Sequence, residues 1–286
     1  MTKLLKGAPL IDMMCEELIE KVQVLATHSI KPCLAIVRVG EKPNDISYEK
    51  TIIKRCDKIG ITAKQVILPE DIPADEFYGN IEALNFDKSI NAILLFRPLP
   101  EHIDGEKARN LIAAEKDVDG CTDLSLAGVF TGKDIGYPPC TAEAAIRILD
   151  FYNIDCSGKK VVVLGRSLVI GRPVAMMLLS KNASVTICHS RSENIAEIAS
   201  SADILIACTG QAESIGAGFT NAEQCIIDVG VSYNAKKQKL CGDVDFDEVA
   251  DKVAAITPVP GGVGGVTSTV LVKNVIEAAI KQNSFQ

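Results

Sequence analysis

The sequence predicts an α/β protein with two lobes, each built on a parallel β-sheet flanked by helices. Short runs rich in Val, Ile and Leu alternate along the chain with longer segments whose apolar residues recur at helical spacing. Trp is absent and aromatic residues make up 5% of the composition, so the core must be mostly aliphatic, as in sheets covered by helices. The 286 residues are enough for two domains.

The first lobe is expected to span residues 1–140. Its first helix, 9–27, repeats apolar residues at helical spacing, and its first strand, 33–39, is a short apolar run that ends at Gly40. The further elements expected here are helix 45–59, strand 61–68, helix 73–85, strand 91–96 and helix 104–114. Residues 116–139 are rich in Gly, Asp and Thr without a clear period, and such irregular segments are often functional.

The second lobe is expected to span residues 141–266. Thr141 has the chemistry of a helix N-cap, which predicts a helix over 142–152 with Glu143 in its first turn. After it we expect strands 160–164, 184–188, 203–208, 225–229 and 253–256, and helices 173–181 and 193–200. A final helix from about 267 to 282 is expected to fold back onto the first lobe, so 267–286 is assigned there.

Composition excludes several classes of protein. The net charge is −7 and no arginine-rich stripe occurs, which disfavours nucleic acid as a partner. The first residues lack the apolar stretch of a signal peptide, and no run was expected to reach the length of a membrane span, so a cytoplasmic location is predicted. The ten cysteines include no C-x-x-C pair and the three histidines are scattered, so neither a disulfide nor a metal site is expected.

The segment 160–173 carries the strongest local signal. A buried strand ends at Gly165 and a helix begins near Pro173, with Ser167 and Gly171 between them. Gly165 permits a sharp turn, Gly171 permits close approach, and the free N–H groups of the following helix can face a pyrophosphate. The spacing G-x-S-x-x-x-G also fits an ordinary tight turn, but its place between strand and helix favours a Rossmann-type dinucleotide site.

The end of the next strand favours NADP over NAD. An NAD site usually has an acidic residue there, whereas this strand is followed by Ser190 and Arg191, and Arg166 lies on the first turn. Two arginines and a serine suit a ribose 2′-phosphate, although they are equally the residues of a solvated surface. Thr209 and Val231 follow later strands and are further candidate cofactor contacts, because ligands lie at the carboxyl ends of parallel strands.

Other segments indicate a second ligand. They are Ser47-Tyr48, Arg97-Pro-Leu-Pro100, Lys116-Asp-Val-Asp-Gly120 and the Pro/Gly loop 256–265. The Pro/Gly loop offers bare backbone groups to a planar heterocycle. The carboxylate of Asp119 can accept two parallel N–H bonds from an amidine-like edge, or it is simply a turn residue before Gly120.

Together these segments resemble one family, the methylenetetrahydrofolate dehydrogenase/methenyltetrahydrofolate cyclohydrolases known as FolD. The resemblance covers nearly the whole chain and rests on Val39-Gly40, Tyr48, Pro98-Leu-Pro100, Glu115-Lys-Asp-Val-Asp-Gly120, Pro139-Cys-Thr141, Val163-Leu-Gly-Arg-Ser167, Cys188-His-Ser190, Gly242-Asp-Val244 and Ile256-Thr-Pro-Val-Pro-Gly-Gly-Val-Gly264, in that order. It implies a folate in a cleft between two α/β lobes, NADP on the C-terminal lobe, and a homodimer.

The candidate residues follow from both lines of reasoning. The expected folate contacts are Tyr48, Pro98, Asp119, Pro258, Gly261 and Gly262. The expected cofactor contacts are Gly165, Arg166, Ser167, Gly171, Ser190, Arg191, Thr209 and Val231.

This chain departs from the family pattern at the positions that the resemblance implies are catalytic. The family has a Lys four residues after the cleft Tyr, on the same helix face, and here that position is Ile52. The Gln that holds this Lys is replaced by Phe96, and the Leu after it by Arg97. The Pro-Met of the glycine loop is Gly265-Val266.

These departures predict which activity is kept. Hydride transfer from a methylene-folate needs alignment with the nicotinamide rather than an obligatory base, whereas hydrolysis of a methenyl-folate needs activated water and a proton shuttle. We expect an NADP-dependent dehydrogenase whose cyclohydrolase activity is weakened or lost. Arg97 would bring a cation into the cleft in place of the Lys, which would allow residual hydrolysis. The alternatives are a fully bifunctional enzyme, an NADP-dependent dehydrogenase of a small acid or amino acid, and a non-catalytic NADP- or folate-binding protein.

Overall fold

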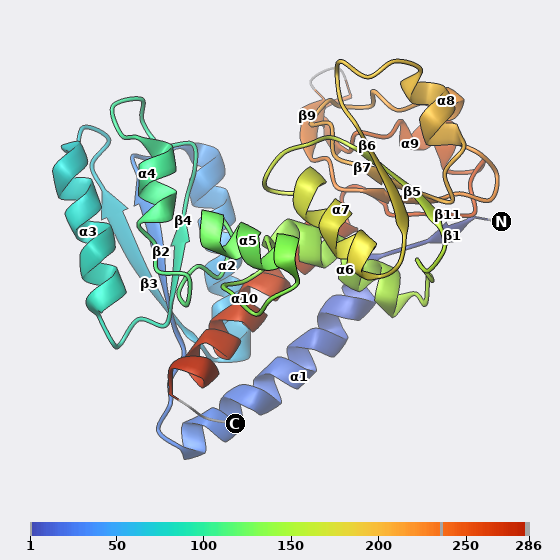
Figure 1. Ribbon diagram of the computed structural model, residues 1–286. Coiled ribbons are helices and arrows are strands. Elements are labelled where there is room, and N and C mark those ends of the chain that lie inside the picture. The colour runs from blue at the N-terminus through green and yellow to red at the C-terminus, as the bar shows by residue number, and fades with distance from the viewer. Residues whose placement is uncertain (1, 235–236, 284–286) are drawn as a thin grey trace. The chain divides into compact units, whose positions relative to one another are not determined.

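The computed structural model describes residues 2–234 and 237–283, and the chain divides into two compact units. Unit 1 comprises Met1–Asp12 and Thr141–Thr267, and unit 2 comprises Met13–Cys140 and Ser268–Gln286. Helices α1 (Gly7–Thr27) and α10 (Val263–Gln282) both begin in unit 1 and end in unit 2 (Figure 1). The first twelve residues were expected in the first lobe, but they group with unit 1.

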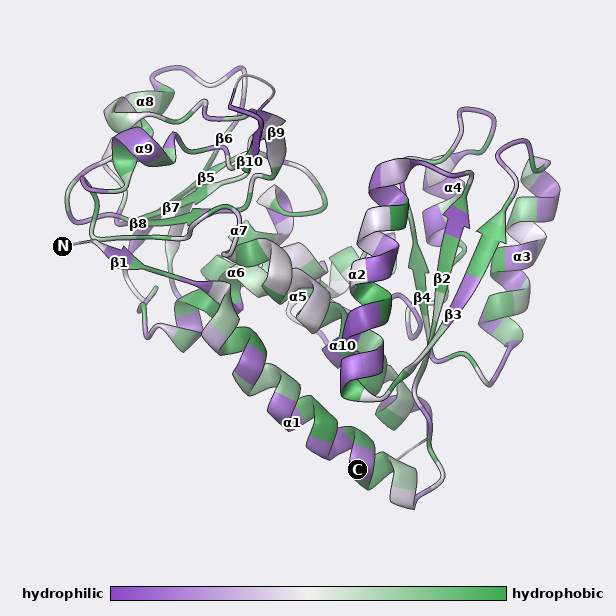
Figure 2. Cartoon of the chain, turned by 180° about the vertical axis from the view of Figure 1, so that it is seen from behind, coloured by the Kyte–Doolittle hydropathy of each residue, from purple (hydrophilic) through white to green (hydrophobic). Residues whose placement is uncertain are grey.

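Unit 2 is built on a three-stranded parallel sheet with strand order β3–β2–β4. The strands are β2 (Cys33–Val39), β3 (Thr62–Leu68) and β4 (Ala92–Leu95), and the helices between and after them are α2 (Pro43–Ile59), α3 (Ala74–Phe86) and α4 (Gly105–Asn110). Helices α3 and α4 cover one face of this sheet and α2 covers the other (Figures 1 and 2). Helix α5 (Asp123–Thr131) follows in unit 2, and α6 (Cys140–Phe151) belongs to unit 1 from Thr141 onward.

The two faces of β2 explain this layering. Ala35 and Val37 are fully buried in an apolar cluster that also contains Phe77 and Ile81 of α3. Successive side chains of a strand point to opposite faces, so the even-numbered residues of β2 face α2. One of them, Arg38, makes a buried ion pair with α2 that is described below.

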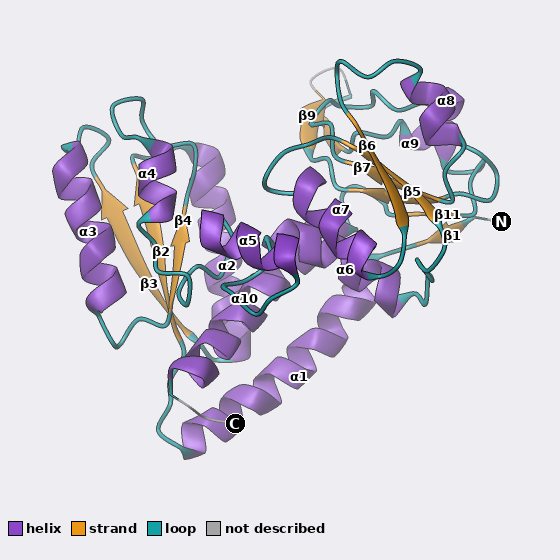
Figure 3. Cartoon of the chain, in the orientation of Figure 1, coloured by secondary structure: helices purple, strands orange, loops and turns teal. Residues whose placement is uncertain are grey.

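Unit 1 is built on a six-stranded sheet with strand order β1–β11–β8–β7–β5–β6, in which every pairing is parallel. The strands are β1 (Lys3–Leu4), β5 (Lys160–Leu164), β6 (Ser184–Cys188), β7 (Ile204–Ala207), β8 (Cys225–Asp228) and β11 (Ala255–Ile256). The helical segments are α7 (Gly171–Ser180), α8 (Ile195–Ser200), the 3₁₀ turn Ala217–Phe219 and α9 (Phe246–Val249) (Figure 3). Strands β9 (Ser232–Asn234) and β10 (Lys239–Cys241) form a separate antiparallel pair.

The inner strands β7, β8 and β11 are buried throughout, as expected when helices cover both faces of a parallel sheet, whereas the edge strands β1 and β6 are partly exposed. Leu205 and Ile226 lie in one apolar cluster with Ala199 of α8 and Val249 of α9. The alternation of strands and helices confirms the predicted α/β class with parallel sheets.

Several elements differ from expectation. Helix α6 begins at Cys140, so Thr141 lies inside its first turn and is not the residue before the helix. Helix α4 ends at Asn110 instead of continuing to Ala114, because the chain turns at Leu111. Helix α5 lies within the segment that was expected to be irregular, and neither β1 nor the β9–β10 pair was expected.

Helix α10 corrects one expectation about apolar length. The helix has 20 residues, and a window of 18 of them has a mean hydropathy of 1.3, which meets the length and composition of a membrane span. However, 72% of this window is buried inside the protein, and buried core helices pass the same test. The helix is therefore weak support for any membrane association.

Candidate active site

Tyr48 and Ile52 lie one turn apart on α2. Ile52 is fully buried and belongs, with Glu49 and Cys56, to the face of α2 that packs into unit 2. Tyr48 lies at the edge of this face and is half-buried. Burial, followed by the charge of Asp119, raises the pKa of Tyr48 well above its ordinary value. The hydroxyl therefore stays protonated at neutral pH and can donate a hydrogen bond.

A buried ion pair anchors α2 beside Tyr48. The Nε of Arg38 on β2 donates to Oε2 of Glu49 at 2.7 Å, and both side chains are less than a tenth exposed. The amide of Gln65 on β3 donates to the other carboxylate oxygen, and the Arg38 guanidinium also donates to the carbonyl of Gly40. These contacts fix the rotation of α2 against the sheet and hence the direction of Tyr48. Sequence reasoning missed this pair.

Phe96 and Arg97 follow β4 directly. The ring of Phe96, which is buried, meets the ring of Tyr48 edge-on with centroids 5.8 Å apart. Arg97 places Nη2 3.6 Å from Oδ2 of Asp119. The structure therefore brings Tyr48, Phe96, Arg97 and Asp119 together, as the sequence predicted for a single site. The ammonium of Lys42, which sequence reasoning missed, donates to the carbonyl of Pro98 at 2.9 Å.

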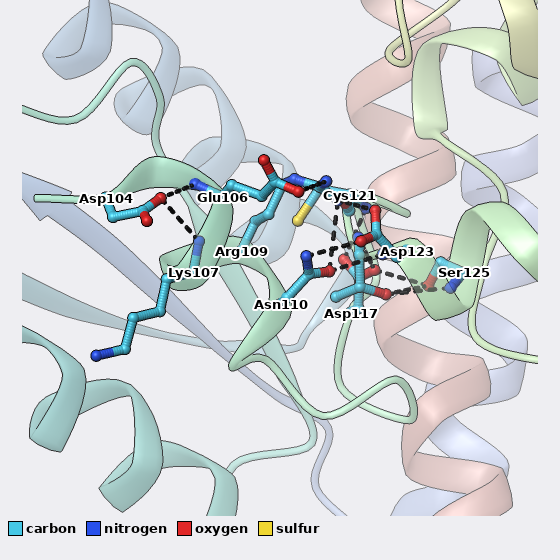
Figure 4. A network of polar contacts seen from close by, with 10 residues as sticks. Asp104, Glu106, Lys107, Arg109, Asn110, Asp117, Cys121, Asp123 and Ser125 are labelled. Carbon is cyan, nitrogen blue, oxygen red and sulfur yellow. Dashed lines mark hydrogen bonds and ion pairs between the residues drawn. The ribbon is translucent and has the colours of Figure 1, made fainter.

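A polar network holds the turn that carries Asp119 (Figure 4). Asp117 is fully buried and its carboxylate accepts from the backbone N–H of Cys121 at 3.0 Å and of Thr122 at 2.8 Å, and from the hydroxyl of Ser125 at 2.6 Å. Gly120 has a φ of +67°, and a Cβ there would collide with the backbone of Pro139. The turn after Asp119 thus requires both the buried carboxylate and a glycine.

Asp119 has the electrostatics of a ligand-binding carboxylate. Desolvation by the surrounding protein raises its pKa to about 6, even though the charge of Arg97 lowers it. A carboxylate held at such a pKa, with a side chain that is 29% exposed, is available to a ligand and is ionised above pH 6.

The second site lies in unit 1 at the carboxyl ends of β5, β6 and β7. A cavity of about 420 Å³ opens there, which is within the range of small-molecule sites. It is lined by Leu164, Gly165, Arg166, Ser167, Cys188, His189, Ser190, Ile195, Cys208, Thr209, Gln211, Ser214, Ile215 and Phe219. Five of the expected cofactor contacts are in this set, and His189, Gln211 and Ser214 were missed.

The glycines of the first turn fit a dinucleotide. Gly165 has a φ of +137°, and a Cβ there would collide with the carbonyl of Cys208, while a Cβ at Gly171 would collide with the carbonyl of Gly165. Ser167 closes the turn by accepting from the N–H of Ile170 at 3.3 Å. No side chain caps the N-terminus of α7. In its first turn the N–H of Arg172 donates to the carbonyl of Ser167 at 3.1 Å and Pro173 has no N–H, so close approach of a pyrophosphate depends on the glycine turn and not on a row of free helix N–H groups. The residues present therefore fit a nicotinamide dinucleotide.

Three expected cofactor contacts do not line the cavity. Arg191 is exposed after β6, where its backbone N–H donates to Nδ1 of His189 at 3.2 Å. Val231 is 60% exposed beyond β8, and Gly171 is covered by the turn it supports. Arg166, which follows β5, and Ser190, which follows β6, do line the cavity, and their side chains suit a phosphate.

The Pro/Gly loop lies in unit 1, whereas Tyr48, Pro98 and Asp119 lie in unit 2, and the structure describes each unit by itself. Within unit 1 the carbonyl of Gly261 accepts from the N–H of Gly7 at 2.8 Å. A Cβ at Gly262 would lie 2.7 Å from the carbonyl of Pro258, which explains the glycine. The predicted folate contacts at Pro258, Gly261 and Gly262 stay predictions.

Comparison with known proteins identifies the family. The model of the tetrahydrofolate dehydrogenase/cyclohydrolase catalytic domain matches residues 5–119, and the model of that family's NAD(P)-binding domain matches residues 139–283. This chain belongs to the tetrahydrofolate dehydrogenase/cyclohydrolase family. The assignment confirms the expected enzyme class, an oxidoreductase of folate-bound one-carbon units, and the dinucleotide-binding lobe predicted from the turn at Gly165.

Relatives of known name extend over the whole chain. The bifunctional protein FolD of Clostridioides difficile is 46% identical over 282 residues, covering 99% of this chain and 98% of the relative. The crystal structure of the bifunctional FolD from Campylobacter jejuni is 36% identical with a TM-score of 0.96, covering 98% of this chain and 99% of that one. The FolD of Trypanosoma brucei, solved with NADP and an inhibitor, is 29% identical with a TM-score of 0.92 and covers 100% and 99%.

Two further groups bear on earlier expectations about cysteine and metal. All ten cysteines lie in the described part of the chain as free thiols, and nine of them are buried. The carboxylates of Glu213, Asp245 and Asp247 lie close enough to hold a cation. The ammonium of Lys237 contacts Glu213 at 2.6 Å and Asp247 at 3.3 Å, so it offsets part of the negative charge of this cluster.

Proposed function

We propose that this protein oxidises 5,10-methylenetetrahydrofolate to 5,10-methenyltetrahydrofolate with NADP⁺ in one-carbon metabolism, and that its cyclohydrolase activity is weakened or lost. The observation that carries the proposal is the fully buried Ile52, which stands where the family resemblance implies a catalytic Lys. Phe96, where the resemblance implies the Gln that holds this Lys, is also apolar and buried.

The hydride transfer does not depend on these positions. NADP⁺, when bound, accepts the hydride from the methylene carbon, and the adjacent folate nitrogen supplies the electron pair that forms the amidinium. The chain contributes alignment. Asp119, ionised above pH 6, accepts from the amidine-like edge of the pterin, and Tyr48 offers a hydroxyl donor.

Hydrolysis of the methenyl group needs a group that takes and returns protons. The guanidinium of Arg97 stays protonated in proteins, so it can supply charge but not act as a base. Tyr48 is held protonated by its raised pKa, and Ile52 and Phe96 carry no titratable group. Residual hydrolysis would then depend on Asp119, whose carboxylate is already engaged by Arg97.

The cofactor preference, assembly and location belong to the same proposal. Arg166 and Ser190 line the cavity at the end of β5 and β6, which favours NADP over NAD, and the Trypanosoma brucei relative was solved with NADP. We further propose a homodimer, as the family resemblance implies, and a cytoplasmic location. Sedimentation of the purified protein would measure its oligomeric state.

Two assays on the same preparation test the proposal. The first follows NADPH formation from methylenetetrahydrofolate, and the second follows decay of methenyltetrahydrofolate against the uncatalysed rate. We expect turnover in the first and no acceleration in the second. Ile52→Lys should gain hydrolysis, whereas Ile53→Lys, on the neighbouring half-buried position of α2, should not. Circular dichroism checks that both variants fold.

Each alternative has its own result. Hydrolysis by the wild-type protein above background would show a fully bifunctional enzyme, as the names of its relatives state for them. Binding of NADP without turnover of the folate would show a non-catalytic binding protein. Turnover with a small acid or amino acid, and none with folate, would show a dehydrogenase of a different substrate.

A further inference from the structure

Two buried carboxylates lie close together in unit 1. One is Asp228 at the end of β8, and the other is Asp243, which follows β10. Asp228 is 3% exposed and Asp243 is fully buried. Asp228 accepts three backbone N–H bonds of 3.0 Å, from Gly230 and Asp243 through Oδ1 and from Val244 through Oδ2. A Cβ at Gly230 would collide with the Asp243 carboxylate, and one at Gly242 with that of Asp228, so both glycines accommodate this acidic pair.

The acidic pair supports one wall of the cofactor cavity. Oδ2 of Asp243 accepts from the N–H of Thr209 and, at 3.0 Å, from the N–H of Gly210. Thr209, together with Gln211 and Ser214 of the same loop, lines the cavity. The other oxygen of Asp243, Oδ1, is buried and has no hydrogen-bond partner. Part of this charge is therefore not compensated by the groups around it.

No arginine or lysine forms an ion pair with either carboxylate within residues 2–234 and 237–283. Burial raises the pKa of Asp228 to about 6, so this group is ionised at pH 8. Arg166 is thus a cation in the lining of the cavity, whereas Thr209, which lines it at another strand end, is backed by the Asp243 carboxylate.

The sheet order shows which half of a dinucleotide each side would receive. In this fold the residue that reads the adenosine ribose follows the second strand, here β6, and the dinucleotide crosses the point where the strand order reverses. That point lies between β5 and β7. The nicotinamide half then lies over β7 and β8, above the acidic pair.

We infer that Asp243, supported by Asp228, makes the site select the oxidised cofactor. The inference rests on the proposed use of NADP. Oxidised and reduced cofactor carry the same phosphates, and they differ by the positive charge of the oxidised nicotinamide. Arg166 therefore acts on both forms alike, whereas a buried negative charge beneath the nicotinamide half favours the oxidised form. An interaction of this kind, between two charges separated by protein, changes affinity on the order of tenfold.

The test measures binding and does not depend on turnover. Dissociation constants for NADP⁺ and NADPH are determined by calorimetry at pH 8 for the wild type and for Asp243→Asn. Asparagine keeps an oxygen that can accept from Thr209 and Gly210, so it removes the charge with little change of shape. We expect NADP⁺ to bind roughly tenfold more weakly and NADPH to be unchanged, which corresponds to about 30 mV in the potential of the bound couple.

Asp203→Asn is the matched control. Asp203 also accepts a backbone N–H, that of Lys160 at 2.8 Å, but it precedes β7 at the opposite end of the strand. Its replacement should leave the ratio of the two constants unchanged. A purely structural role for Asp243 would weaken both nucleotides equally, and that result, like an unchanged ratio, would overturn the inference.

Failure to bind a nucleotide and failure to fold have different meanings. If the wild-type protein binds neither nucleotide, the proposed cofactor is wrong rather than the role of Asp243. If Asp243→Asn does not fold, Asp228→Asn carries the same expected change of ratio. If neither variant folds, the wild-type constants decide, because NADPH bound more tightly than NADP⁺ contradicts the inference and the reverse order supports it.

Discussion

The guanidinium of Arg97 lies 3.6 Å from the carboxylate of Asp119, and both side chains are 29% exposed. The pair is partly buried. Two effects therefore act in opposite directions on the pKa of Asp119: desolvation raises it, and the charge of Arg97 lowers it. Desolvation is the larger effect, and it raises the pKa of Asp119 to about 6. A carboxylate expected to bind substrate therefore titrates close to the working range of the enzyme.

The first prediction concerns pH and substrate affinity. Below pH 6 Asp119 is protonated and loses an acceptor for the pterin edge, so the KM for methylenetetrahydrofolate should rise as the pH falls through this value. Arg97→Leu removes the cation that lowers this pKa, so the same rise should begin at higher pH. Initial rates between pH 5 and 9 at saturating NADP⁺ measure both profiles. Superimposable profiles would show that Arg97 does not act on Asp119.

The second prediction concerns stability. The pKa of Asp119 in the folded protein exceeds its ordinary value of 3.8, so its contribution to stability is complete below pH 3.8 and is lost as the pH rises through 6. Asp119→Asn should therefore be more stable than the wild type at pH 8, by up to about 3 kcal/mol. Urea unfolding at pH 8 and pH 4 should show the difference at the higher pH and little at the lower. A variant that is less stable at pH 8 contradicts this reading.

The third prediction separates two arginines. Arg166 lines the cofactor cavity and Arg191 does not, although sequence reasoning paired them. Arg166→Ala should weaken NADP binding by roughly 10- to 100-fold, the value of a charged hydrogen bond to phosphate, and leave NAD binding nearly unchanged. Arg191→Ala should have a much smaller effect. An equal loss of NADP affinity in both variants would show that Arg166 and Arg191 both contact the cofactor, as the sequence predicted.

The fourth prediction concerns the first turn. Gly165→Ala combines a strained φ with a collision against Cys208, so it should destabilise unit 1 by about 3 kcal/mol or more and abolish nucleotide binding. Gly218→Ala serves as the comparison, because a Cβ there meets open space and its φ is ordinary. Thermal unfolding of both variants provides the measurement. If alanine is tolerated at both positions, the turn is more adaptable than its geometry indicates.

Strands were predictable where short runs are rich in Val, Ile and Leu and lie between turn residues. The expected bounds of β2, β5 and β6 are those of the structure. Helix α5 was missed because its apolar residues do not follow a helical period, and Leu124 and Phe130 are exposed. Strand β1 has two residues and exists through pairing with β11 about 250 residues away, which no local pattern can reveal.

Site residues were predictable where they directly follow a predicted strand. Arg166, Ser167, Ser190 and Thr209 line the cavity, as expected for positions that follow parallel strands. Arg38, Asp117 and Asp243 were missed, because each acts through partners that the fold supplies from elsewhere in the chain. Their signal in the sequence is a charged residue within or beside an apolar run, which by itself does not distinguish a buried polar contact from an exposed one.

The two units share helices rather than linkers, since α1 and α10 each start in one unit and finish in the other. A gene that encoded either unit alone would have to begin or end inside a helix, and no single crossover within a loop would exchange one unit between relatives. Exchange of a cofactor lobe between relatives therefore needs two crossovers, one on each side of residues 141–262, and it leaves the first twelve residues of unit 1 behind.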